Sequence, residues 1–123
     1  MSKTDENLEK NFKGETSEVG LYLAMSKQAE IEGYPDIAMY LRQVAMDEAW
    51  HAAWVAKIQG KIGTTKENLE KMLSGESGAT VGKAEAAKIA REEGNEEAAR
   101  FFEIASRDED RHRAGLEGFL KKL

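Results

Sequence analysis

What the sequence lacks narrows its fold class. Cysteine is absent from these 123 residues, and proline occurs once, at Pro35. Without cysteine there is no disulfide framework, no thiolate metal site and no rubredoxin-like or zinc-ribbon module. The single proline, the 33% of charged residues and the lack of sustained apolar–polar alternation favour helices over strands. A chain of this length is expected to form one domain with one core.

Two further absences concern location and partners. No apolar run approaches membrane-spanning length, and residues 1–5 are too polar for a signal peptide. We therefore expect a cytoplasmic protein with no membrane partner. The net charge of −5 comes without an evident basic stripe, so we expect no nucleic-acid partner either.

Turn and cap residues divide the chain into four expected helices. Gly33 is placed for a left-handed helix end, and Pro35 suits the first turn of the next helix. Residues 60–64 interrupt the helical spacing of apolar residues, and Thr64 and Glu67 then have the spacing of a capping box. The expected helices cover about residues 5–32, 35–59, 64–94 and 95–122.

The two halves of the chain repeat one another. Residues 1–62 align with residues 62–123 without a gap, and Glu-Asn-Leu-Glu-Lys occurs in both. We therefore predict an all-α, four-helix bundle with pseudo-two-fold symmetry. Its single domain, residues 1–123, would comprise helical hairpins at about residues 4–59 and 65–122, joined by the linker 60–64.

The repeat carries a metal-binding pattern. Residues 47–51 and 108–112 both read Asp-Glu-x-x-His, which places Glu and His on one helix face. Glu15 and Glu76 each follow a glycine and precede these motifs by the same distance. The candidate metal ligands are therefore Glu15, Glu48, His51, Glu76, Glu109 and His112.

These ligands fall within apolar stripes. Between Ile37 and Ile58, for example, positions spaced by three and four read Ile, Leu, Val, Glu, His, Val, Ile. Burying a charge without compensation costs several kcal/mol per ion. Four glutamates and two divalent ions balance, so the pattern predicts a dinuclear site. Oxygen and imidazole ligands suit iron or manganese, and zinc stays an alternative.

The residues 14–22 and 89–94, together with the two Glu-x-x-His motifs, resemble the ferritin-like di-iron domain of the rubrerythrin family over essentially the whole chain. The resemblance implies a ferritin-like bundle with two iron ions per site, held by the six candidate ligands, with Glu48 and Glu109 bridging the metals. It also implies hydrogen bonds that orient the imidazoles by pairing Asp47 with His112 and Asp108 with His51.

Three departures from the family qualify this resemblance. The usual four-cysteine rubredoxin domain is lacking, which implies a separate rubredoxin-like electron donor for a stand-alone ferritin-like domain. Many relatives have a further glutamate where this chain has Ala79, but the repeat mate of Ala79 is Glu18, a candidate seventh carboxylate ligand. The family tyrosine is kept at Tyr22, whereas its mate is Lys83. Either side chain could donate a hydrogen bond to a metal-bound carboxylate, and the lysine could instead extend to solvent.

The resemblance implies a peroxidase that reduces hydrogen peroxide to water in oxidative stress defence. The alternatives are a ferroxidase or oxygen-activating site, and a metal-binding bundle without turnover. In a ferritin-like bundle the second and third helices run parallel, so their link must span roughly 33 Å, whereas residues 60–64 reach at most about 17 Å. We therefore expect a domain-swapped homodimer, with an up-down-up-down monomer as the alternative.

Overall fold

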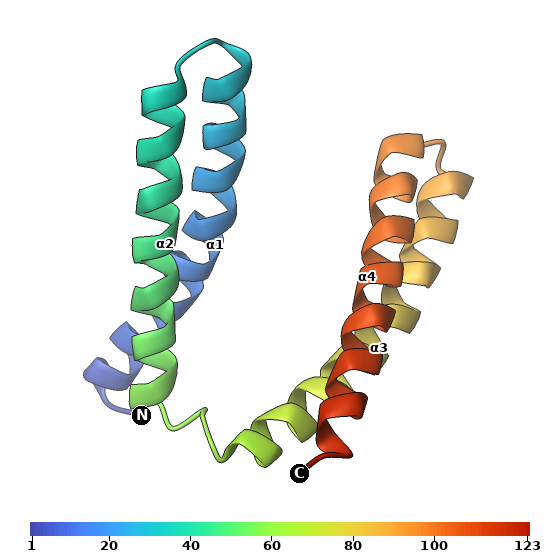
Figure 1. Ribbon diagram of the computed structural model, residues 1–123. Helices are drawn as coiled ribbons and strands as arrows, with labels where there is room; N and C mark the ends of the chain where they lie inside the picture. Colours follow the sequence, from blue (N-terminus) through green and yellow to red (C-terminus); the bar gives the residue numbers. More distant parts are fainter. The chain divides into compact units, whose positions relative to one another are not determined.

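The computed structural model describes residues 1–123 and contains four helices and no strand (Figure 1). This confirms the all-α class, and each helix begins and ends within about two residues of the expected position. None of the four helices is long and apolar enough to span a lipid bilayer. The helices are α1 (Lys3–Ile31), α2 (Pro35–Ile58), α3 (Thr65–Glu92) and α4 (Glu96–Leu120).

The helices form two compact units, Met1–Ile62 and Gly63–Leu123, which coincide with the sequence repeat. In the first unit α1 packs against α2, and in the second α3 packs against α4 (Figure 1). Each unit is thus a helical hairpin, and each is described here by itself. That the two hairpins complete one domain stays a prediction.

The residues that end and begin helices act as the sequence predicts. Gly33 and Gly94 follow α1 and α3 with positive φ angles of 86° and 76°, a backbone conformation that glycine adopts without steric cost. Thr64 and Glu67 form the capping box of α3, each side chain accepting from the other residue's backbone N–H. Ser2 caps α1 in the same way, and α1 begins at Lys3, two residues before the predicted start at Asp5.

Small residues fill the interior of each hairpin. Ala38 and Ala99 are fully buried and occupy equivalent positions in the repeat, so both hairpins share a close helix–helix approach. The larger apolar residues of the expected core are covered only in part within their own hairpin, and Ile58 is 57% exposed. One helix pair encloses only the line where its helices touch, because enclosing a bundle core takes further helices.

An ion pair joins the two helices of each hairpin, with its charges reversed between the repeats. In the first hairpin, Arg42 on α2 pairs with Glu30 on α1 and also donates a hydrogen bond to buried Ser26 at 3.1 Å. In the second, Arg91 on α3 pairs with Glu103 on α4. The two pairs occupy matching positions, so each hairpin keeps the interaction while exchanging which helix carries the cation.

Candidate metal centre

The first hairpin brings three of the candidate ligands together. Glu15 comes from α1, whereas Glu48 and His51 lie one helical turn apart on α2, as the i,i+3 spacing predicts. One donor atom from each lies within 4.8 Å of the other two. His51 Nδ1 is 3.4 Å from Glu15 Oε2 and 3.6 Å from Glu48 Oε1, so this ring nitrogen faces both carboxylates.

The second hairpin repeats this geometry. Glu76 comes from α3, while Glu109 and His112 lie on α4, and their donor atoms again fall within 4.8 Å of one another. His112 Nδ1 is 3.5 Å from Glu76 Oε2 and 3.6 Å from Glu109 Oε1. The repeat therefore creates two equivalent half-sites, each with two carboxylates and one imidazole.

The carboxylates of both half-sites lie in a setting that suits a cation. The four glutamate side chains are only 16–19% exposed. Oε2 of Glu15 and Oε2 of Glu76 are buried without a hydrogen-bond partner. A buried, unpaired carboxylate oxygen is costly, and a metal ion relieves that cost by accepting the lone pair. The donor set therefore fits a hard or borderline divalent ion.

The histidines are less enclosed than their place in the apolar stripe predicted. His51 and His112 have side chains that are 57% and 52% exposed within their own hairpins. Both stand at the border of the helix pair, where two helices provide only part of an enclosing wall. Their Nδ1 atoms face the glutamates, which leaves each Nε2 free for a partner outside the ligand set.

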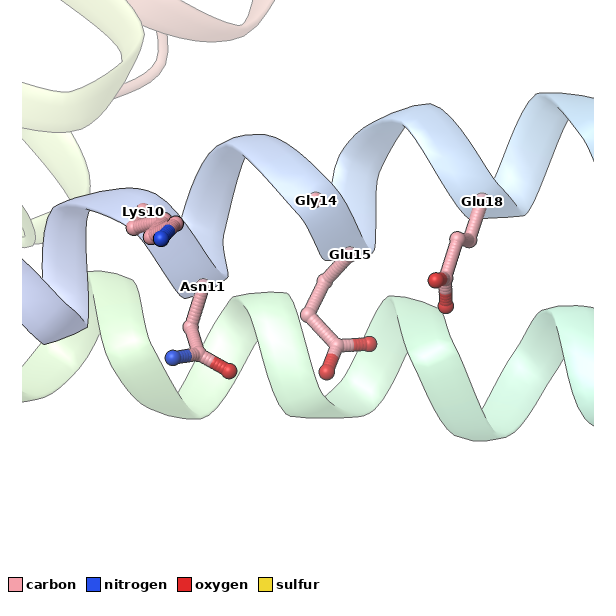
Figure 2. Close-up of a pocket in the computed structure, with 5 residues that line it drawn as sticks. All are labelled: Lys10, Asn11, Gly14, Glu15 and Glu18. Atoms are coloured by element: carbon pink, nitrogen blue, oxygen red, sulfur yellow. The ribbon is translucent and has the colours of Figure 1, made fainter.

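A seventh carboxylate adjoins the first half-site. Figure 2 shows Glu15 and Glu18 extending from α1 toward α2, along a hollow that Asn11 and Gly14 also line. A hydrogen bond with Glu48, assisted by burial and by the negative charge of Glu48, raises the pKa of Glu18. The group of possible ligand atoms in this hairpin nevertheless comprises Glu15, Glu48 and His51 without Glu18, so a seventh ligand stays a prediction.

A lysine side chain adjoins the second half-site. Lys83 Nζ lies 3.3 Å from Glu109 Oε2, so this lysine turns toward the carboxylates rather than into solvent. Burial acts to raise the pKa of Glu109, but hydrogen bonds from Lys83 and with Glu76, and the nearby positive charge, lower it overall. The repeat mate of Lys83, Tyr22, is half-buried and makes no hydrogen bond to a candidate ligand.

The two aspartates of the motifs have partners on their own helices. Asp47 accepts a hydrogen bond from Gln43 at 3.3 Å, and Asp108 accepts one from Arg111 at 2.6 Å. The pairs implied by the resemblance, Asp47 with His112 and Asp108 with His51, each join one hairpin to the other. They stay predictions.

Comparison with known proteins identifies the family of this chain. The model of the Rubrerythrin family matches residues 6–72 and again residues 67–123, once for each hairpin. The chain belongs to the rubrerythrin family. Its membership confirms the resemblance carried by the ligand motifs and the ferritin-like fold class that the repeat and the motifs imply.

Two curated relatives align with nearly all of the chain. The uncharacterized protein MJ0746 of Methanocaldococcus jannaschii is 46% identical over 122 residues, which cover 98% of this chain and 86% of that protein. Reverse rubrerythrin-1 of Clostridium acetobutylicum is 38% identical over 119 residues, covering 95% of this chain and 66% of that protein. The chain thus spans just under two thirds of the reverse rubrerythrin.

Proposed function

We propose that this protein holds two iron ions per site and reduces hydrogen peroxide to water with electrons from a separate donor. The observation that carries the proposal is the pair of matching half-sites, each with a buried carboxylate oxygen that has no partner. Together they offer four carboxylates and two imidazoles, the ligand set of di-iron carboxylate proteins built in helical bundles. Membership of the rubrerythrin family supports iron as the metal.

The reaction requires two electrons and two protons for each peroxide: H2O2 + 2e− + 2H+ gives two H2O. Two bound ferrous ions supply the two electrons when the site is loaded. The protein's part would be to hold the ions, and Glu48 and Glu109 would be among the carboxylates that hold them. Four carboxylates neutralise the four positive charges of two divalent ions, which allows the ions to be held in the interior of a bundle.

Residues beside the ligands would adjust the site during turnover. Glu18 lines the same hollow as Glu15, and its carboxylate would be available as a further ligand for the ions. Lys83 donates to Glu109 and limits the negative charge on the other half-site. Tyr22 is placed at the equivalent position of the first hairpin, where a phenol can donate without adding charge.

The electrons would arrive from another protein. These 123 residues contain no cysteine to bind a mononuclear iron, so we propose a rubredoxin-like donor as the partner. The donor must deliver two electrons per peroxide, one at a time from a one-iron protein. Turnover in vitro should therefore depend on added rubredoxin and its reductase.

The test begins with metal content. Protein reconstituted anaerobically with ferrous iron should bind close to two irons per chain by elemental analysis, and Glu48→Ala together with Glu109→Ala should abolish this binding. A ratio near one, or iron retained by the double variant, would overturn the dinuclear site. The same analysis of protein purified without added metal distinguishes iron from manganese and zinc.

Stopped-flow oxidation of the ferrous protein then tests the reaction. Stoichiometric peroxide should oxidise it much faster than dissolved oxygen, and Glu18→Ala should slow the reaction with peroxide. Glu92→Ala, an exposed change on α3, is the matched control and should have no effect. Oxidation by oxygen at an equal or higher rate would assign the site to oxygen activation or ferroxidation. Metal-dependent folding with no redox reaction would leave a structural metal bundle.

A further inference from the structure

The two half-sites differ in charge at two positions beside their ligands. In the repeat, Glu18 of the first hairpin corresponds to Ala79, and Tyr22 corresponds to Lys83. Glu18 lines a hollow beside a candidate ligand of its own hairpin, whereas Lys83 forms an ion pair with Glu109. The first half-site therefore has an additional carboxyl group beside it, and the second has an ammonium group.

Lys83 contacts one oxygen of a candidate ligand. Its Nζ lies 3.3 Å from Oε2 of Glu109, and the two side chains are 33% and 19% exposed. The other oxygen of this carboxylate, Oε1, lies 3.6 Å from Nδ1 of His112. The lysine thus occupies one side of a carboxylate that the half-site offers to a metal ion. Because the pair is largely shielded from solvent, its charge is screened less than that of an exposed lysine.

The first half-site has no lysine or arginine in an ion pair with its ligands. Its two glutamates pair only with His51, which is charged only when it is protonated. Lys10 lines the hollow beside Glu15, but it is exposed, and its counterpart in the repeat is another exposed lysine, Lys71. Since both hairpins have a lysine at that position, Lys83 is the cation that distinguishes the two half-sites.

We propose that Lys83 is a built-in counter-ion of the second half-site, which makes the two half-sites of one chain bind divalent metal with unequal affinity. This inference rests on the proposed two-ion site. Before metal binds, the ammonium group balances one carboxylate charge, and when a divalent ion binds, the same group repels it. At a separation of about 6 Å, one unit charge changes the dissociation constant of a divalent ion by about tenfold even at the dielectric constant of water. The first half-site should therefore fill first.

Lys83 has the opposite effect on the metal-free hairpin. Glu76 and Glu109 approach the same nitrogen of His112, at 3.5 Å and 3.6 Å, so two carboxylate charges lie close together. An ammonium group beside Glu109 offsets their repulsion and should stabilise the empty hairpin. Lys83 is thus a positioning residue and not a ligand, because it stabilises the empty half-site and weakens metal binding there.

Titration with cobalt(II) tests the difference between the half-sites in the full-length chain. Glu76→Gln with Glu109→Gln leaves the first half-site intact, and Glu15→Gln with Glu48→Gln leaves the second. Visible absorption of the bound ion reports the affinity and the coordination of the remaining half-site. The second half-site should bind cobalt at least about tenfold more weakly than the first. Equal affinities, or tighter binding by the second half-site, would overturn the inference.

Removing the charge of Lys83 tests its role directly. Where only the second half-site is intact, Lys83→Met should tighten cobalt binding about tenfold, whereas Lys83→Arg keeps the charge and should leave the affinity almost unchanged. Where only the first half-site is intact, Lys83→Met should have no effect. Lys88→Met removes an equal charge from an exposed position on α3 and should change neither affinity. No tightening by Lys83→Met, or equal tightening by Lys88→Met, would refute the counter-ion role.

Thermal unfolding of the metal-free protein provides a second readout. In EDTA, Lys83→Met should lower the melting temperature more than Lys88→Met does, because only Lys83 balances a carboxylate of the half-site. A melting temperature for Lys83→Met equal to or above that of Lys88→Met would contradict the proposal.

These results separate the counter-ion from the proposed reaction. A natural chain that binds two irons and reduces peroxide, while Lys83→Met leaves the affinity of the second half-site unchanged, would refute the counter-ion and keep the proposed function. Tighter binding in Lys83→Met, together with an iron-loaded protein that does not react with peroxide, would keep the counter-ion and refute the peroxidase reaction.

Discussion

Replacing Glu15 by glutamine should affect stability in opposite directions with and without metal. Glu15 Oε2 is buried and has no hydrogen-bond partner, although His51 Nδ1 and Glu48 lie nearby. Glutamine keeps the volume of glutamate, removes its charge and offers an amide N–H to either neighbour. In the metal-free protein, Glu15→Gln should therefore raise stability. In the presence of ferrous iron it removes a ligand, so the stabilisation by metal should fall.

The size of both effects follows from burial and chain length. Relieving one unsatisfied buried acceptor is worth about 1–3 kcal/mol. At roughly 2.1 cal/mol/K of unfolding entropy per residue, a chain of 123 residues converts 1 kcal/mol into about 4 °C. The metal-free variant should thus melt about 4–12 °C higher than the natural protein. One ion at a concentration of 100 Kd contributes about 2.7 kcal/mol, or roughly 10 °C, to a protein with intact ligands.

Thermal unfolding followed by circular dichroism measures both effects, with EDTA or anaerobic ferrous iron at one fixed protein concentration. Glu76→Gln alters the equivalent carboxylate of the second hairpin and should behave alike. Glu92→Gln, on the exposed face of α3, should change neither melting temperature. If Glu15→Gln destabilises the metal-free protein, then the carboxylate supports the hairpin itself, and the argument that it is held ready for a cation fails.

Three further predictions concern the hairpins. Thr64→Ala removes the N-cap of α3 and should cost about 1 kcal/mol, or roughly 4 °C of melting temperature, while Thr65→Ala should cost less. The backbone hydrogen bond from Thr64 lowers the pKa of Glu67. The loss of unfolding free energy caused by Glu67→Gln should therefore be at its full size above about pH 4.5 and should disappear as the pH falls through the pKa of Glu67 in the folded protein. Urea unfolding at several pH values measures this. Glu30→Arg and Arg42→Glu should each destabilise alone, whereas the double variant, which copies the charge order of the second hairpin, should recover most of the loss in a double-mutant cycle.

The features that sequence alone predicts are local ones. Apolar residues at intervals of three and four establish the helices, and Gly33, Gly94 and Thr64 mark their ends because each adopts a backbone or cap geometry that few other residues accept. The pairing of Glu48 with His51 follows from helix geometry alone. Glu15 joins this pair only through a contact between two helices, which helix geometry alone does not predict. The repeat supports the contact, because Glu76 precedes Glu109 by the same number of residues as Glu15 precedes Glu48.

The features that sequence leaves open depend on how two helices meet. The apolar stripes indicate which side of a helix is inward, but they do not show that Ala38 and Ala99 make the closest contact while larger residues stay partly exposed. The ion pair of Glu30 with Arg42 was missed because twelve residues separate its members. A search for matching positions with exchanged charge could have found it, since Arg91 and Glu103 lie at the same places in the repeat.

The differences between the hairpins fall into two kinds with different physical effects. Exchanging the charges of the ion pair leaves the net charge of a hairpin unchanged and affects only its own two helices. The change from Glu18 to Ala79 removes a negative charge, and the change from Tyr22 to Lys83 adds a positive one. Both of these lie beside candidate ligands, because Glu18 lines a hollow with Glu15 and Lys83 forms an ion pair with Glu109. The two half-sites therefore have the same types of ligand and differ in net charge.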